Sequence, residues 1–275
     1  MAYFDKGGDF VFYEIPVNEY GIDSFEIFAK FVELERLKRA GPLMHGVNGE
    51  AEARKFASDS NPRFSISHGQ SVADHTLEAI TLNKIIGIRY YEFIQNDFDH
   101  DVYYDADFAL WQHDLGEYIY GDIADDGTRP KNTDQKERLI LQESLWDKLE
   151  NCSWSDWLKS LHNEMENETT NFGVYCKMLD KFSLVLACLC YERQGHGGNT
   201  DIKESCFRLS DKDKKAIDYT GSKLTADIFL YSALEGHPKF LEHPCLKAFI
   251  QIIQSGAQVV RGHEIEWLYR YLSTK

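Results

Sequence analysis

The sequence predicts an all-α fold, and two observations support this prediction. Apolar residues recur three or four positions apart over most of the 275-residue chain, which is the spacing of one helix face. Apolar residues make up 43% of the chain and aromatic residues 13%, enough for a large packed core. No internal repeat or proline-rich linker divides the chain, so we expect one elaborated helical domain rather than two independent ones.

We interpret residues 1–60 as an N-terminal extension that belongs to the same domain. A short strand is expected at residues 10–15. A helix is expected at residues 22–39, where apolar residues keep helical spacing and Gly41-Pro42 ends the run. Residues 46–70 are expected to form a loop, because Gly, Asn and Ser interrupt the apolar pattern there.

Residues 61–200 form the predicted core, and it contains the clearest helix start. Ser71 is followed three residues later by Asp74, which matches a capping box ahead of the apolar run at residues 77–86. Further helices are expected at residues 105–120, 134–149, 155–166 and 171–193, and a glycine-rich loop at 195–199 ends this part. Residues 201–275 are expected to form a C-terminal helical extension, with helices at 224–234, 246–255 and 264–272.

Charge and cysteine usage restrict the classes of function. The chain has 30 Lys and Arg residues against 45 Asp and Glu residues, a net charge of −15, which disfavours binding to nucleic acid polymers. The six cysteines contain no CxxC pair and are expected to be reduced thiols. The N-terminus lacks the layout of a signal peptide, and no apolar run is long enough to cross a membrane. We therefore expect a cytoplasmic protein with no membrane partner.

The segment around His113-Asp114 contains the most informative cluster of polar residues. Adjacent residues on a helix point about 100° apart, so His113 and Asp114 can both reach one metal ion beside the helix. Glu117 comes four residues after His113, on the same side, and Asp122 follows just past the expected helix end. A His-Asp pair alone occurs by chance in many proteins, so it predicts metal binding only together with other ligands.

Two distant residues complete a candidate ligand set. His75 lies in the first turn of the helix that starts after Ser71. Asp180 interrupts the most apolar helix, where an ionised carboxylate is costly to bury unless it is paired or bound to a cation. His75, His113, Asp114 and Asp180 are a mixed nitrogen and oxygen set for one divalent ion. Such a set suits Co, Mn, Fe or Zn, and Mg is also allowed.

This order of residues resembles the HD superfamily of metal-dependent phosphohydrolases, and the local motifs are similar to its 5′-deoxynucleotidase branch. The similarity extends over about residues 63–198. Four segments show it: Ser71-Val72-Ala73-Asp74-His75, His113-Asp114-Leu115-Gly116-Glu117 with Gly121-Asp122-Ile123, Pro130-Lys131, and Lys177-Met178-Leu179-Asp180-Lys181.

The resemblance implies a helical HD-domain bundle with additions at both ends and a role for each matched residue. His75, His113, Asp114 and Asp180 would be the metal ligands. Glu117 would orient or deprotonate the attacking metal-bound water, and Asp122 would assist the nucleophile or protonate the leaving 5′ oxygen. The implied reaction is release of phosphate from deoxyribonucleoside 5′-monophosphates.

Substrate contacts are also implied by the resemblance. Arg63-Phe64 corresponds to an Arg–aromatic pair upstream of the first histidine, although Phe stands where the family has Trp and the spacing to His75 is shorter. Lys131 and Lys181 are candidate phosphate partners. The expected partner is a small nucleotide, and a homodimer is an assembly that the family uses.

Two alternatives remain open from the sequence. The same HD site would serve a nucleoside triphosphohydrolase or a cyclic nucleotide phosphodiesterase, although an acidic chain is poorly suited to a triphosphate. A metal-containing HD-fold protein used only for binding would need neither Glu117 nor Asp122 beside the ligands.

Overall fold

The computed structural model describes residues 2–4, 10–12, 71–89, 100–117, 132–149, 153–193 and 211–275. These residues are almost entirely helical apart from a short hairpin, so the all-α prediction is confirmed. The hairpin pairs β1 (Ala2–Phe4) with β2 (Phe10–Phe12) in antiparallel register, with Tyr3 opposite Val11. Of the strand predicted at residues 10–15, the structure describes residues 10–12, which form β2. The helix predicted at 22–39 and the loops predicted at 46–70 and 195–199 lie outside the described residues.

The start of the helical body agrees with the sequence signal. Ser71 Oγ accepts a hydrogen bond from Asp74 N at 3.0 Å, and Asp74 Oδ2 accepts one from Ser71 N at 2.9 Å. This reciprocal pair satisfies two backbone donors that a helix start leaves open. The helices are α4 (Val72–Arg89), α6 (His100–His113), α8 (Thr133–Leu141), α9 (Trp154–Asn167), α10 (Asn171–Arg193), α12 (Asp211–Thr220), α13 (Thr225–Gly236), α14 (Leu246–Arg261) and α15 (Glu266–Ser273).

Some boundaries differ from the predictions. The helix expected at residues 105–120 begins earlier, at His100, and ends at His113, where a turn follows. The helix expected at 134–149 changes geometry, because α8 passes into the π-helical η2 (Gln142–Trp146) and the 3-10 helix η3 (Asp147–Leu149). Helix α12 was not predicted, since Ala216 is its only buried residue and a single position gives no apolar period. A 3-10 helix, η5 (Pro238–Glu242), links α13 to α14.

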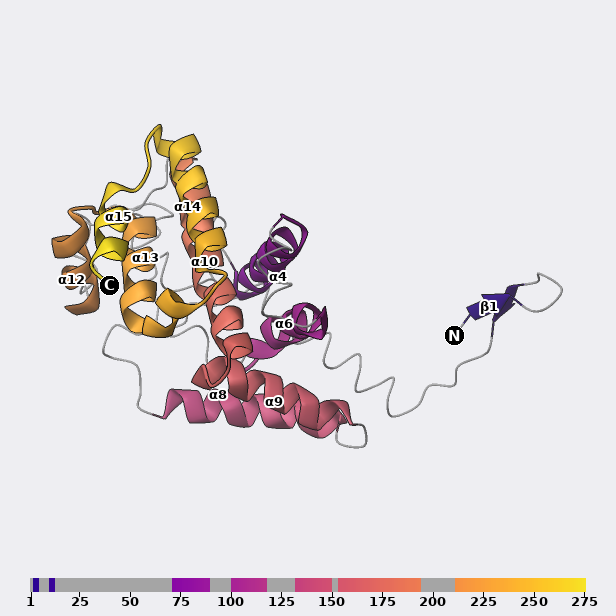
Figure 1. Ribbon diagram of the computed structural model, residues 1–275. Helices are drawn as coiled ribbons and strands as arrows, with labels where there is room; N and C mark the ends of the chain where they lie inside the picture. Colours follow the sequence, from indigo (N-terminus) through magenta and orange to yellow (C-terminus); the bar gives the residue numbers. More distant parts are fainter. Residues whose placement is uncertain are drawn as a thin grey trace.

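Helix α10 is the centre of the helical body. It contacts α4 and α6 on one side, α13 and α14 on another, and α9 near its first turns (Figure 1). The main core continues from α4 through α10 to α15, so the C-terminal helices share one core with the preceding ones. Phe182 of α10, for example, packs its ring 5.5 Å from Phe240 and 5.2 Å from Phe249.

A smaller apolar cluster lies between the start of α4, the end of α6, η2 and α9. Its buried members are Val72, Leu115, Leu141, Leu145, Trp146 and Leu158. We call it the small core. Because Val72 precedes His75 and Leu115 follows His113-Asp114, this cluster supports two segments that carry predicted metal ligands.

Two further expectations concern the described part of the chain. Within that part, the thiols of Cys176, Cys188, Cys190 and Cys245 form no disulfide bond, in agreement with the expectation of reduced cysteines. None of its helices combines the length and the apolarity that crossing a bilayer requires.

Candidate metal centre

Three predicted metal ligands meet although they come from three different helices. His75 lies in the first turn of α4, His113 ends α6, and Asp180 lies in the middle of α10. One ligand atom of each lies within 4.8 Å of the others. His75 Nε2 is 2.9 Å from Asp180 Oδ1, and His113 Nε2 is 3.7 Å from the same oxygen. His75 and Asp180 are almost completely buried, at 0% and 3% exposure.

Asp114, the fourth predicted ligand, lies in the turn that follows α6. Its Oδ2 is 3.2 Å from His113 Nε2, so its carboxylate belongs to the same cluster. The expectation that His113 and Asp114 share one continuous helix is wrong, because the chain turns through residues 114–116. Leu115 N donates to Gln112 O at 3.1 Å and Glu117 N donates to Asp114 O at 3.0 Å in this turn.

The turn depends on a glycine because the backbone of α8 passes close to it. A Cβ atom on Gly116 would lie 2.5 Å from the carbonyl oxygen of Glu137, closer than non-bonded atoms allow. The backbone of α8 can therefore pack directly against the segment that connects Asp114 to Glu117. This contact gives a physical reason for Gly at the fourth position of the His113-Asp114-Leu115-Gly116-Glu117 motif.

A hydrogen bond orients the ring of His113. Its Nδ1 donates to the carbonyl oxygen of Leu110 at 2.6 Å, one turn earlier in α6. With Nδ1 carrying a proton, the lone pair of neutral His113 is on Nε2, which faces Asp114 and Asp180. Among the described residues, this buried Nε2 makes no hydrogen bond, although Asp114 Oδ2 lies 3.2 Å away. It is therefore available as a ligand atom.

The electrostatics of the cluster favour a positive charge. Burial alone would lower the pKa of His113, but the carboxylates of Asp114 and Asp180 outweigh it and raise that pKa to about 10. Burial would raise the pKa of Asp180, but Lys181 and the two histidines hold it well below its usual range. Asp180 therefore stays ionised, and the space between the ligands attracts either a proton or a metal ion.

Two lysines flank Asp180 on α10 and differ in their surroundings. Lys177 Nζ is 2.9 Å from Glu166 Oε1 and 3.8 Å from Asp180 Oδ2, and its side chain is largely buried. Burial opposes its charge, but Glu166 and Asp180 raise the pKa of Lys177 above its usual value. Lys181 Nζ is 2.9 Å from Asp180 Oδ2, and its side chain is 34% exposed. Lys177 is thus buried in the fold, whereas Lys181 faces solvent at the edge of the cluster.

The other predicted site residues divide into two groups. Glu117 is buried and directly follows the turn, three residues from Asp114. Arg63, Phe64, Asp122 and Lys131 lie outside the described residues.

Two buried residues near the cluster had no sequence signal. Gln112 is completely buried beside His113, in a position that helical spacing alone cannot distinguish from a solvent-facing one. His162 of α9 packs its ring 5.4 Å from that of Trp146, and burial lowers its pKa to about 4. Its electrostatic interaction with His113 and Lys177 places it near the metal ligands. Its neighbours come from distant parts of the chain, so no local pattern could have identified it.

The chain matches one protein family over much of its length. The HD domain family matches residues 59–219, more than half of the chain. A solved structure of a conserved hypothetical protein from Pyrococcus furiosus is similar, with 18% identity and a TM-score of 0.46, covering 78% of this chain and 99% of that one. No curated protein matches the sequence. The family match spans all four predicted ligands, and three of them meet on separate helices; the chain belongs to the HD-domain family.

Proposed function

We propose that this protein is a 5′-deoxynucleotidase that releases phosphate from deoxyribonucleoside 5′-monophosphates. Membership of the HD-domain family supports metal-dependent phosphohydrolase chemistry in general. The observation that carries the proposal is the buried cluster of His75, His113 and Asp180, with Asp114 beside it. The preference for a deoxynucleoside monophosphate rests on the similarity of the sequence motifs.

The donor set fits one divalent metal ion. Two imidazole nitrogens and a carboxylate oxygen approach within 4.8 Å of one another, and Asp114 supplies a second carboxylate. This mixture suits Co, Mn, Fe or Zn, with Mg also allowed. Such an ion, when bound, would neutralise charge on the phosphoryl oxygens and make a water molecule more acidic. The Leu110 carbonyl would hold the His113 ring in the required orientation.

Glu117 is the proposed base. It lies three residues after Asp114 across the turn that Gly116 permits, and it is buried at 9% exposure. A carboxylate there would accept the proton of the attacking water. Asp122 is proposed to protonate the leaving 5′ oxygen.

Lys181 is proposed to contact the phosphate. It keeps 34% of its side chain exposed and already lies 2.9 Å from Asp180. Lys177 is less suited to this role, because it is buried and bonded to Glu166. Arg63, Phe64 and Lys131 remain proposed substrate contacts, and a homodimer remains the proposed assembly. The net charge of −15 supports a small nucleotide, rather than a nucleic acid polymer, as the partner.

The test is phosphate release by metal-stripped protein resupplied with Co²⁺, Mn²⁺ or Mg²⁺, with dAMP, AMP and dATP as substrates. Metal-dependent release from dAMP with little from AMP is the expected result. Release of pyrophosphate or triphosphate from dATP would instead indicate that the protein is a nucleoside triphosphohydrolase. No turnover of any of the three would contradict the proposed function and favour a binding role.

Glu117→Gln tests the assignment of the base. The variant should keep its metal content and lose about 10²–10⁴-fold in turnover, because the amide cannot accept the proton. The control is Glu242→Gln, at an exposed position in η5, which should keep the wild-type rate. Full activity of Glu117→Gln would show that another group accepts the proton.

A further inference from the structure

We propose that Gln112 is a positioning residue for the metal centre, because it fixes the end of α6 at which His113 and Asp114 lie. The inference rests on the proposed function in one respect: it takes these two residues to be metal ligands. Gln112 itself touches neither the ion nor the substrate in this proposal.

Both ends of the Gln112 amide are used in hydrogen bonds to other elements. Its Nε2 donates to the carbonyl oxygen of Leu158 in α9 at 2.9 Å. Its Oε1 accepts from the indole Nε1 of Trp146, the last residue of η2, also at 2.9 Å. One completely buried side chain therefore ties the last turn of α6 to two elements that are distant in sequence.

The surroundings make these two bonds effective. Trp146 and Leu158 are members of the small core, and Leu115 lies in it too. In such an apolar environment a hydrogen bond is stronger than in water, and a buried polar group without a partner is costly. The amide thus has one well-defined position, and the end of α6 is held with it.

The backbone of Gln112 also begins the turn that carries Asp114. Its carbonyl oxygen accepts from Leu115 N at 3.1 Å. The side chain and the backbone of one residue thereby connect the small core to the turn. Metal centres need their ligands within about 0.5 Å of the productive geometry, so a looser helix end should weaken binding.

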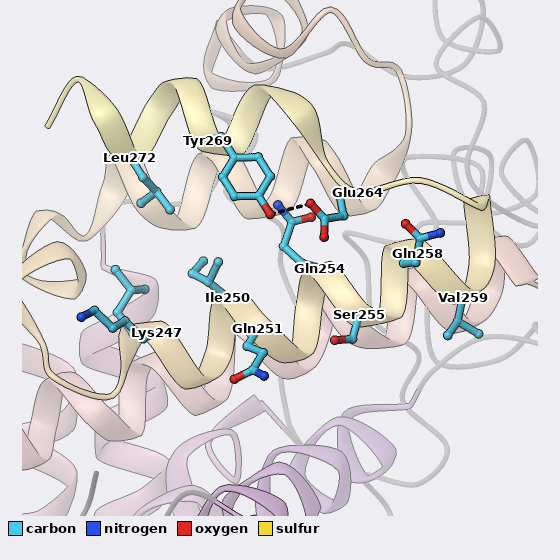
Figure 2. A pocket seen from close by; sticks show the side chains of 11 residues that line it. Lys247, Ile250, Gln251, Gln254, Ser255, Gln258, Val259, Glu264, Tyr269 and Leu272 are labelled. Carbon is cyan, nitrogen blue, oxygen red and sulfur yellow. Dashed lines mark hydrogen bonds between the residues drawn. The ribbon is translucent and has the colours of Figure 1, made fainter.

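A residue with the same chemistry elsewhere provides a matched control. Gln254 of α14 is also buried, at 6% exposure. Its Nε2 donates to Ile265 O at 3.2 Å, and its Oε1 accepts from Ile265 N at 2.7 Å. Figure 2 shows it beside a surface groove of about 640 Å³ between α14 and α15, among residues that include none of the predicted metal ligands. Its replacement should cost stability without affecting the metal.

The experiment compares Gln112→Leu with Gln254→Leu in the full chain. Metal-stripped protein is titrated with Co²⁺, and the Kd and the visible absorption spectrum of the bound ion are recorded. Gln112→Leu should weaken Co²⁺ binding by about 10-fold, the low end of the effect of outer-shell residues, and should change the spectrum. Gln254→Leu should bind within about twofold of the wild type, because the sites are independent. Both should lower the melting temperature.

The outcomes separate the inference from the proposed function. If wild-type protein binds Co²⁺ and Gln112→Leu binds it with the same Kd and spectrum, Gln112 is only structural and the inference is overturned. If wild-type protein binds no Co²⁺, the metal centre itself is wrong and the inference falls with it. Should Gln112→Leu fail to fold, Trp146→Phe removes the indole donor and keeps a ring; a wild-type Kd and spectrum there would equally overturn the inference.

Discussion

Two buried charged clusters lie along α10, and they differ in how completely their groups are paired. Near its C-terminal end, Arg261 donates to both oxygens of Glu192 at 2.7 Å and to Asp227 at 3.0 Å. These three side chains are between 3% and 9% exposed. In the middle of the helix, two histidines face Asp180, and His113 Nε2 makes no hydrogen bond within the described part of the structure.

This difference shows that burial alone does not determine the role of a charged cluster. A guanidinium group matches two carboxylates in charge and in shape, so the cluster around Arg261 can serve as a structural link between α10, α13 and α14. The cluster around Asp180 consists of groups that bind metals, and it raises the pKa of one of its own histidines to about 10. The second cluster could hold a metal ion, whereas the guanidinium group of Arg261 already supplies the cation of the first.

Asp114→Ala should produce the largest contrast between the clusters. Removing this carboxylate should abolish bound metal and reduce phosphate release by at least about 100-fold, because the ion is lost with its ligand. Metal content by mass spectrometry and phosphate release are the measurements. Asp218→Ala, at an exposed position in α12, is the control and should keep both. A full equivalent of metal in Asp114→Ala would exclude Asp114 as a ligand.

Arg261→Leu should affect stability and leave the metal centre intact. The change leaves Glu192 and Asp227 buried without their cation, which costs about 3–5 kcal/mol of unfolding free energy. Urea unfolding measures the loss, and the Co²⁺ Kd should stay at its wild-type value. Lys247→Leu on the same helix is the control, since Lys247 is exposed, and it should change stability by no more than about 0.5 kcal/mol. A weakened metal site in Arg261→Leu would show that the two clusters are coupled through α10.

His162→Phe should change the pH dependence of stability by a smaller amount. Burial lowers the pKa of His162 to about 4, so the folded protein keeps this ring neutral while the unfolded chain takes up a proton below pH 6.5. Wild-type stability should therefore fall between pH 6.5 and pH 4 by at most about 3 kcal/mol from this residue.

In His162→Phe that part of the slope should disappear in urea unfolding measured across this pH range. His263→Phe, at an exposed position, is the control and should retain the wild-type slope. An unchanged slope in His162→Phe would mean that folding does not lower the pKa of His162.

The sequence predicted those helix positions that depend on residues close together in the chain. The Ser71–Asp74 capping box located the start of α4, and the long apolar run located α10. Helix α12 could not be predicted from its pattern, because it buries a single residue. The end of α6 was missed, since the turn that follows it packs Gly116 against the α8 backbone, a contact with a segment that lies further along the chain.

The candidate site was also predictable only in part, because its residues come from distant parts of the chain. His113 and Asp114 are adjacent in the sequence, but His75 and Asp180 are 105 positions apart and meet only in the folded chain. The order of the motifs indicated that His75 and Asp180 would meet. Their spacing in the sequence alone could not have indicated this. The bonds of Gln112 to Trp146 and Leu158 left no trace in the sequence pattern.

The packing of Phe182 has a practical consequence for anyone who expresses this protein. The HD-domain match stops at residue 219, yet the helix that carries Asp180 rests its Phe182 ring on Phe240 and Phe249. A protein trimmed to the matched region would leave this aromatic surface in water and would tend to aggregate in the cell. Truncation for crystallography or fusion work should therefore keep the chain through Tyr271, the last buried residue, so that α10 remains covered.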